Sequence, residues 1–183
     1  MTANRYVLSV LSSDRPGIIA DVSSIVEQLG GNIVSCSQTV LDGYFTFITI
    51  IDLPKEYDPV QLAAAVKYPH KLNAGYQVTA VKYEPQNAVP PSGGETYIIT
   101  AFGKDQPGIV KGFSRCLAAH DININDLYGG HREGDFVLVG QLTVPPEVNI
   151  HSIKEDLEET GKDYNFTVKV QHNDVFTATN RIR

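Results

Sequence analysis

The chain has 183 residues, of which 42% are hydrophobic and 20% are charged, a composition typical of globular proteins rather than disordered or fibrous ones. Its formal net charge is -6, and its 15 Lys and Arg residues form no cluster. Direct binding of nucleic acid is therefore not expected, because such binding needs cations that displace phosphate counterions. No apolar run approaches the ~20 residues that cross a bilayer, and no secretory signal precedes the first strand. We expect a cytoplasmic protein that contacts neither a membrane nor DNA directly.

An internal repeat organises the chain. Shifted by 91 residues, the stretch 6–54 lies over 97–145 without a gap. After the second helix of each copy the shift becomes 88, which places Tyr76 on Tyr164 and indicates a three-residue deletion in the second copy. Residues rich in Pro and Gly separate the copies and favour neither a helix nor a central strand. The predicted organisation is a first domain (1–84), a linker (85–95), a second domain (96–172) and a C-terminal tail (173–183).

Each copy begins with a strand that leads into a helix. In the first copy the β-rich run 5–12 precedes Asp14-Arg15-Pro16-Gly17, and Pro16 suits a first helical turn because its missing N–H would have no partner there anyway. Apolar residues then recur at the spacing of one helical face, namely Ile18, Ile19, Val22, Ile25, Val26 and Leu29. Gly30-Gly31 can end this helix in a left-handed cap. The second copy has Asp121-Ile122 there, so we expect its helix to end differently.

A hairpin, a second helix and a last strand complete each copy. The extended runs 32–41 and 44–53 flank Asp42-Gly43, a strong hairpin signal. A second helix is predicted from Pro59 to a point before Pro69, and 77–83 is predicted as the last strand. The order β-α-β-β-α-β predicts an α+β fold: two tandem ferredoxin-like domains, each an antiparallel four-stranded sheet with its helices on one face.

The third strand of the first copy bears on assembly. Both alternating faces of 44–51 carry apolar side chains, whereas a sheet with one wet face should alternate apolar with polar. The helices can cover only one face of the sheet. We therefore expect the other face to meet a further sheet, from the sister domain or from a second chain, and we expect a homodimer.

The loop between the first strand and the first helix carries the candidate chemistry. A helix N-terminus presents unpaired N–H groups that can hold a carboxylate, Gly17 permits close approach to the backbone, and Asp14 can accept from an ammonium group. Asn32, eighteen residues after the Asp, offers both a donor and an acceptor. Together these groups complement a zwitterionic α-amino acid. A single Asp-x-Pro-Gly would more often be a simple turn, but here it occurs twice, each time followed by Asn-Ile at the same spacing.

This combination resembles the ACT domain over nearly the whole chain except the linker and the tail. The pattern is closest to that of a tandem-domain transcriptional repressor, carried by Asn32-Ile33, Gly43-x-Phe45-Thr46-Phe47-Ile48 and Thr100-Ala101-x-Gly103-x-Asp105-x-Pro107-Gly108-Ile109-Val110. The resemblance implies amino-acid binding at a domain interface. At the positions of this sequence that match the family's binding residues, the resemblance implies that the ligand is bound by Asp14, Gly17, Ile18, Asn32, Asp105, Gly108, Ile109 and Asn123. A further ligand contact in some relatives falls on Ser12, but on Gly103 in the second copy, which implies a weakened or altered second site.

The resemblance also implies a non-catalytic regulator that senses an amino acid and acts through a protein partner, a transcription factor. The alternative is a regulatory subunit of an amino-acid metabolic enzyme, which would make that enzyme the partner. A small ferredoxin-like enzyme is a third class, but no nucleophile, acid–base or metal-ligand pattern supports it. We expect no cofactor and no metal. Cys36 and Cys116 are interpreted as core residues, and His131 as part of a solvated charge cluster.

Overall fold

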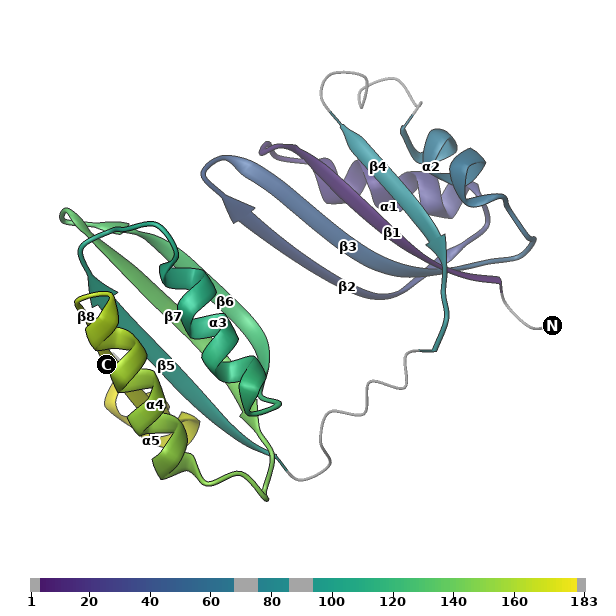
Figure 1. The fold of residues 1–183 in the computed structure, drawn as a ribbon. Coiled ribbons are helices and arrows are strands. Elements are labelled where there is room, and N and C mark those ends of the chain that lie inside the picture. Colours follow the sequence, from purple (N-terminus) through teal and green to yellow (C-terminus); the bar gives the residue numbers. More distant parts are fainter. Residues whose placement is uncertain (1–3, 68–75, 86–93, 181–183) are drawn as a thin grey trace. The chain divides into compact units, whose positions relative to one another are not determined.

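The computed structural model describes residues 4–67, 76–85 and 94–180 (Figure 1). The chain divides into two compact units, 1–86 and 87–183, each of which is described by itself. The predicted linker lies largely, and Pro69 and the end of the tail lie wholly, outside the described residues.

The first unit is one antiparallel sheet with two helices. Its elements are β1 (Asn4–Ser13), α1 (Ile18–Gln28), β2 (Asn32–Leu41), β3 (Tyr44–Leu53), α2 (Pro59–Lys67) and β4 (Gln77–Lys82). The strand order is β2-β3-β1-β4, and both helices lie on one face (Figure 1). Alternate residues of β1, such as Leu8 and Val10, are fully buried against Ile18 and Val22 of α1 and Leu62 of α2. The period-2 and helical-face patterns of the sequence thus meet in one core.

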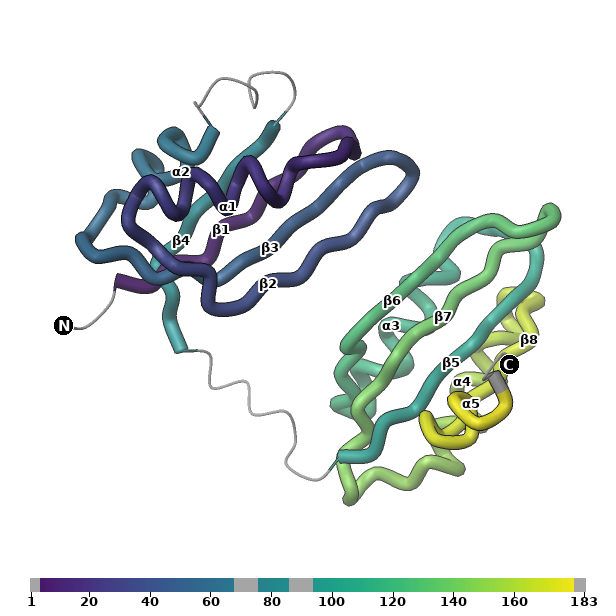
Figure 2. Tube along the Cα trace, turned by 180° about the vertical axis from the view of Figure 1, so that it is seen from behind, coloured from purple at the N-terminus to yellow at the C-terminus, as the bar shows by residue number. Residues whose placement is uncertain are grey.

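The second unit repeats this arrangement and adds a helix. Its elements are β5 (Glu95–Gly103), α3 (Ile109–Ala119), β6 (Asn123–Arg132), β7 (Asp135–Val144), α4 (Ile150–Asp163), β8 (Phe166–His172) and α5 (Asn173–Asn180). The strand order is β6-β7-β5-β8. Residues 173–180 of the stretch predicted as a tail form α5, which contacts β5 and β8 on the face opposite α3 and α4 (Figure 2). The predicted tandem ferredoxin-like fold is confirmed.

Strand pairing confirms one repeat shift and corrects the other. Tyr6 pairs with Ile51, and Tyr97 with Leu142, so a shift of 91 holds for the first three strands. Leu11 pairs with Gln77, however, and its counterpart Phe102 pairs with Thr167, which makes the shift of the last strand 90. The predicted shift of 88 is therefore wrong. Tyr76 corresponds to Phe166, which like it is buried, and not to Tyr164.

The two first helices end alike, contrary to the sequence expectation. Gly30 has a φ of 74° and Asp121 a φ of 55°, so both lie in the left-handed region. The N–H of Gly31 donates to Val26, and that of Ile122 donates to Leu117, which is the same six-residue closure. Aspartate tolerates this conformation better than most side chains, so it can stand in for glycine here.

The helices contact the outer strands β2 and β6 only to a small extent, and Ile33 and Ile124 near the strand starts pack against the two cores. All residues of β2 except Ile33 are exposed, including Cys36. The interpretation of Cys36 as a core residue is wrong, because of the β2 residues only Ile33 packs against the first core and Cys36 is exposed. Cys116 packs at the margin of the second core. No helix in the described part of the chain is both long and apolar enough to span a bilayer.

Candidate functional site

The loop between β1 and α1 is shaped by one glycine. Gly17 has a φ of 93° and precedes the first helical residue, Ile18, and its carbonyl accepts from the N–H of Asp21 at 2.9 Å. A residue with a Cβ would be strained at this φ. The backbone N–H of Asp14 donates to the carbonyl of Gly43 at 2.7 Å, which ties the loop to the β2–β3 hairpin turn. The glycine cannot cap the helix with a side chain, so the N–H groups of the first turn point out of its end.

The predicted residues of this loop contribute in different ways. Asp14 is exposed, so its carboxylate is accessible. Ile18 is 1% exposed and points into the core, so only its N–H can meet a ligand. Ser12 is 3% exposed, and its hydroxyl donates to the carbonyl of Ser13 at 3.0 Å, which places it behind the loop. The accessible groups are therefore a carboxylate and a set of backbone N–H groups.

Arg15 supports the first loop through contacts with Asp21 and Tyr76, which the sequence alone did not predict. The guanidinium of Arg15 donates to Asp21 Oδ2 and to the hydroxyl of Tyr76, both at 2.7 Å, and lies 5.6 Å from the centre of the Tyr76 ring. The hydrogen bond to Asp21 raises the pKa of Arg15. Burial raises the pKa of Tyr76 against the lowering effect of the guanidinium, so the hydroxyl stays protonated. These contacts hold the loop against the residue that directly precedes β4.

The second loop has the same backbone and different side chains. Gly108 has a φ of 95° and precedes Ile109, which is 3% exposed. Gln106 takes the place of Arg15, and its side-chain amide donates to the carbonyl of Tyr164. The Tyr164 ring lies against Gly112, where an added Cβ would come within 2.6 Å of it. An aromatic side chain thus covers the start of α3.

His131 engages the second motif aspartate. Its Nε2 lies 3.0 Å from Asp105 Oδ2, and its ring packs edge-on against Phe136 at 5.5 Å. The interpretation of His131 as a solvated charge is incomplete, since it is exposed but paired. In the first copy Val40 stands at this position, 91 residues earlier. The hairpin-to-loop contact could have been inferred from a 2-3-1-4 strand order, which brings that hairpin beside the loop.

The two asparagines do not join these loops. Asn32 pairs with Asp52, at the end of the sheet where β1 begins, whereas Asp14 follows the last residue of β1. Ten residues of strand separate the two ends, which is roughly 30 Å. Asn123 pairs with Thr143, so it likewise lies at the far end from Asp105. Asp14 and Asn32 of one module therefore cannot contact one ligand, because β2 runs parallel to β1 and starts at the end of the sheet where β1 begins.

The remaining His, Cys, Asp and Glu side chains are the candidate ligands for a metal site. Within the described ranges, no group of three or more His, Cys, Asp or Glu side chains could hold a metal ion. His120 Nε2 contacts Asp156 at 2.7 Å between α3 and α4. Burial raises the pKa of the nearby Cys116, which keeps the thiol protonated and weakly nucleophilic.

Fold and loops together define a tandem ferredoxin-like protein in which each module starts its first helix at a left-handed glycine. ACT domain models match residues 6–66 and 95–171. The chain belongs to the ACT domain family. ACT domains are regulatory modules that sense amino acids, and these matches indicate no catalytic domain.

Several single-module relatives align with the chain. A UPF0237 protein of Methanopyrus kandleri is 34% identical over 86 residues, which is 46% of this chain and 96% of that protein. A Pyrobaculum aerophilum UPF0237 protein is 35% identical over 89 residues, 48% of this chain and 99% of the relative. The match to a Methanosarcina mazei relative is 41% identical but spans only 61% of that protein's length and 31% of this chain.

Two solved structures share the fold over almost the whole chain. A protein of Galdieria sulphuraria has a TM-score of 0.71 and 20% identity, and the match covers 93% of this chain and 98% of that one. A protein named as a candidate glycine cleavage system transcriptional repressor has a TM-score of 0.67 and 17% identity, with the same coverage. At this identity the likeness shows the fold alone.

Proposed function

We propose that this protein is a non-catalytic, amino-acid-sensing regulator that acts in the cytoplasm through a protein partner. One observation carries the proposal: the turn strand–Asp-x-Pro-Gly–helix occurs twice. Each time an exposed aspartate carboxylate precedes a helix whose N-cap residue is a glycine and makes no side-chain cap hydrogen bond. The turn belongs to a domain family that senses amino acids.

The chemistry of the loop fits the two charges of an amino acid. The first-turn N–H groups of α1, on Ile18, Ile19 and Ala20, have no earlier helical carbonyl to bond, and the helix dipole favours an anion there. They would receive the ligand's carboxylate. Asp14 would accept from its ammonium group in a charge-assisted hydrogen bond.

The asparagines would take part only between modules. Since Asn32 lies at the opposite end of its sheet from Asp14, it can complete a site only for the loop of another module, such as one in a second copy of the chain. This arrangement would couple ligand binding to assembly, because a ligand that touches two modules binds their paired state more tightly.

The repressor name of a structural neighbour suggests the output. Like that protein, this chain would regulate transcription, and it would do so through a transcription factor rather than by direct contact with DNA. The net charge of -6 supports the indirect route, since a duplex repels an acidic surface. A gel-shift titration with duplex DNA at physiological salt should show no complex, and a micromolar complex with steep salt dependence would contradict the indirect route.

A thermal-shift screen of the twenty amino acids tests the proposed ligand class. Selective binding to the folded state should raise the melting temperature, with a stabilisation of about 2.7 kcal/mol at a ligand concentration one hundred times Kd. The Asp14→Ala, Asp105→Ala double variant is the matched control and should lose the shift. If none of the twenty shifts the wild-type protein, or if the double variant responds equally, the proposed ligand class is wrong. Turnover of the ligand in the same samples would contradict a non-catalytic role.

A further inference from the structure

The space beside the helix-start glycine is bordered by a different side chain in each unit. A Cβ built on Gly17 would lie 3.6 Å from Nη1 of Arg15. A Cβ built on Gly108 would lie 3.6 Å from both Cε1 and the hydroxyl oxygen of Tyr164. Because glycine lacks that Cβ, a ligand held at the helix start can approach a guanidinium in the first unit and an aromatic ring in the second.

This difference comes from the exchange of a whole group of side chains. Each polar residue that surrounds the first loop has a smaller or less polar counterpart in the second unit: Ser12 corresponds to Gly103, Arg15 to Gln106, Asp21 to Gly112 and Tyr76 to Phe166. An added Cβ on Gly103 would come within 2.6 Å of the carbonyl oxygen of Asn165, and one on Gly112 within 2.6 Å of the Tyr164 ring. The segment 164–166 thus takes the place that polar side chains fill in the first unit.

The guanidinium of Arg15 has donors to spare. Within the described ranges, three of its five N–H groups donate, to the carbonyl of Pro16 at 3.0 Å, to Asp21 and to Tyr76. Nη1 makes only the bond to Pro16, so one of its N–H groups is free beside Gly17. The Arg15 side chain is 38% exposed. A guanidinium in this position can donate to a carboxylate or amide oxygen of a ligand.

Tyr164 gives the second loop an apolar border. Its side chain is half-buried and packs against the second core. Gln106, in place of Arg15, is neutral and donates its amide to the carbonyl of Tyr164. An aliphatic or aromatic ligand side chain placed on this ring would leave water and gain contact with the ring face, which is favourable for apolar groups.

We propose that Arg15 and Tyr164 give the two loops different ligand preferences. The first loop favours an amino acid whose side chain ends in a carboxylate or amide oxygen, which accepts from Nη1 of Arg15. The second loop favours an amino acid with an apolar side chain, which packs on the Tyr164 ring. The inference rests on the proposed function, because it requires both helix starts to hold the ligand's α-carboxylate. The chain then responds to two classes of amino acid rather than to one.

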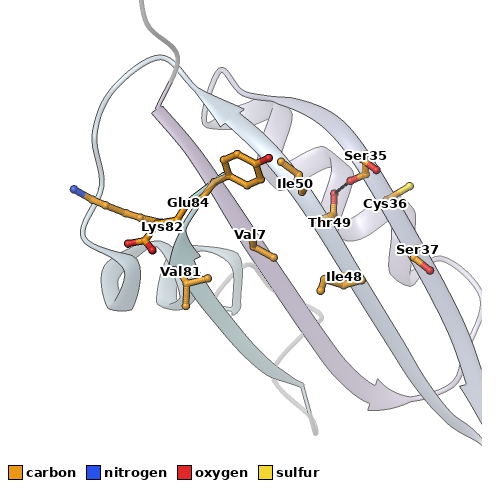
Figure 3. A pocket seen from close by; sticks show the side chains of 11 residues that line it. Val7, Ser35, Cys36, Ser37, Ile48, Thr49, Ile50, Val81, Lys82 and Glu84 are labelled. Atoms are coloured by element: carbon orange, nitrogen blue, oxygen red, sulfur yellow. Dashed lines mark hydrogen bonds between the residues drawn. The ribbon is translucent and has the colours of Figure 1, made fainter. Parts of the chain in front are cut away.

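A hollow in the first unit supplies a reference region for the test. It has a volume of about 650 Å³ and lies on the face of the first sheet opposite α1 and α2, its helix-free face, where Val7, Ile48, Ile50 and Val81 line it (Figure 3). Roughly 20 Å of strand separates Val7 from the end of β1, where the loop begins. Amides that line the hollow should therefore not respond to a ligand at the loop.

Amide chemical shifts of the ¹⁵N-labelled full chain measure binding at each loop separately, in titrations with L-glutamate, L-glutamine and L-leucine. Glutamate and glutamine should bind more tightly than leucine at residues 14–20, and leucine more tightly at residues 105–111. Arg15→Gln installs the residue of the second loop. It should lower the affinity of the first loop for glutamate and glutamine, relative to leucine, roughly tenfold, the lower end of the range for a hydrogen bond to a charged group.

Tyr76→Phe is the matched control, since it removes the hydroxyl that braces Arg15 and leaves Nη1 in place. It should keep the order and ratio of the three affinities. If Arg15 only shaped the loop, both variants would instead weaken all three ligands alike. Tyr164→Ala should lower the affinity of the second loop for leucine relative to glutamate a few-fold, whereas Tyr164→Phe, which keeps the ring and its packing, should not.

The outcomes separate this inference from the function on which it rests. If neither loop responds to any of the twenty amino acids, the proposed function and the inference both fail. If amino acids bind at the loops but both loops rank the three ligands in the same order, or if Arg15→Gln leaves the ratio at the first loop unchanged, the inference is overturned and the proposed function stands.

Discussion

The two modules share a backbone and differ in the side chains that surround their motif loops. The glycines at the helix starts have φ values of 93° and 95°, and the first helices have the same length. In the first module, Asp14 is exposed and a guanidinium braces the loop. In the second, His131 contacts the motif aspartate and Tyr164 lies over the start of the helix. Duplication has kept the geometry of the loop while its access and charge have diverged, so the two modules should not bind a ligand equally.

The sheet faces diverge in the same manner. On its helix-free face the first sheet exposes Ile48 and Val81. The second sheet bears α5 beside β5 and β8 on that face and leaves Phe102 and Tyr128 exposed. The two sheets therefore differ in the added helix rather than in whether apolar side chains stay exposed on this face.

The largest expected effect tests whether the two units fold separately. Leu8→Ala removes a fully buried side chain from the first core and should destabilise that unit by ~2–5 kcal/mol, through lost burial and the cavity left behind. Ile99→Ala is the matched change in the second unit, where Ile99 is 1% exposed. Calorimetry should show that each variant lowers a different transition. A single transition lowered equally by both would mean that the units unfold together.

Loss of the motif carboxylates should weaken ligand binding unequally. Asp14→Ala removes an accessible acceptor and should reduce affinity at the first loop roughly 10- to 150-fold, the range for a charge-assisted hydrogen bond. Asp105→Ala should cost less, because His131 already engages that carboxylate. Titration calorimetry on both variants measures the difference. Equal losses would show that the histidine does not matter, and no loss in either would place the site elsewhere.

His131→Val tests the difference between the loops directly, because it installs the Val40 of the first module in the second. With Asp105 released to accept from a ligand ammonium group, affinity at the second loop should rise by a few-fold, on the order of one hydrogen bond's ~1 kcal/mol. Titration calorimetry at constant pH measures this change in affinity. Val40→His, the reverse exchange, should lower affinity at the first loop, and an unchanged affinity in both exchanges would remove His131 from the account.

The smallest expected effect concerns how the stability of the first unit depends on pH. The hydrogen bond from Arg5 holds the pKa of Asp52 below its usual range, against the raising effect of desolvation. The stabilisation is therefore present above the ordinary carboxyl pKa and is lost as pH falls through the lowered value. Asp52→Asn should reduce the melting temperature of the first unit slightly at neutral pH and not at all in strong acid. A variant effect that persists unchanged at pH 2 would mean that the pair acts through packing rather than charge.

Much of the fold could be predicted because periodicity, glycine turns and the repeat all report local structure. The hairpins at Asp42-Gly43 and Glu133-Gly134 and the helix starts at Gly17 and Gly108 lie where the pattern put them. Two of the overturned expectations, one of strand register and one of spatial position, show what the sequence lacks. Matching Tyr76 to Tyr164 gives the wrong register for the last strand, because only the pairing of that strand with β1 or β5 fixes its register.

The other failure was spatial. Asn32 and Asp14 recur at a constant spacing, but α1 returns the chain so that β2 runs parallel to β1. Asn32 therefore starts β2 at the end of the sheet where β1 begins, far from Asp14. The contacts of Arg15 with Tyr76 and of His131 with Asp105 likewise join residues 61 and 26 positions apart, through sheet order rather than through any local signal.

The central claim is that an amino acid binds at the starts of α1 and α3, and amide chemical shifts test it most directly. In a titration of the uniformly ¹⁵N-labelled wild-type protein with the amino acid that stabilises it most, the account predicts the largest shifts at residues 14–20 and smaller ones at 105–111. Amides lining the hollow of the first sheet should move little. Saturable shifts confined to the hollow, or an absence of saturable shifts at both helix starts, would contradict the account.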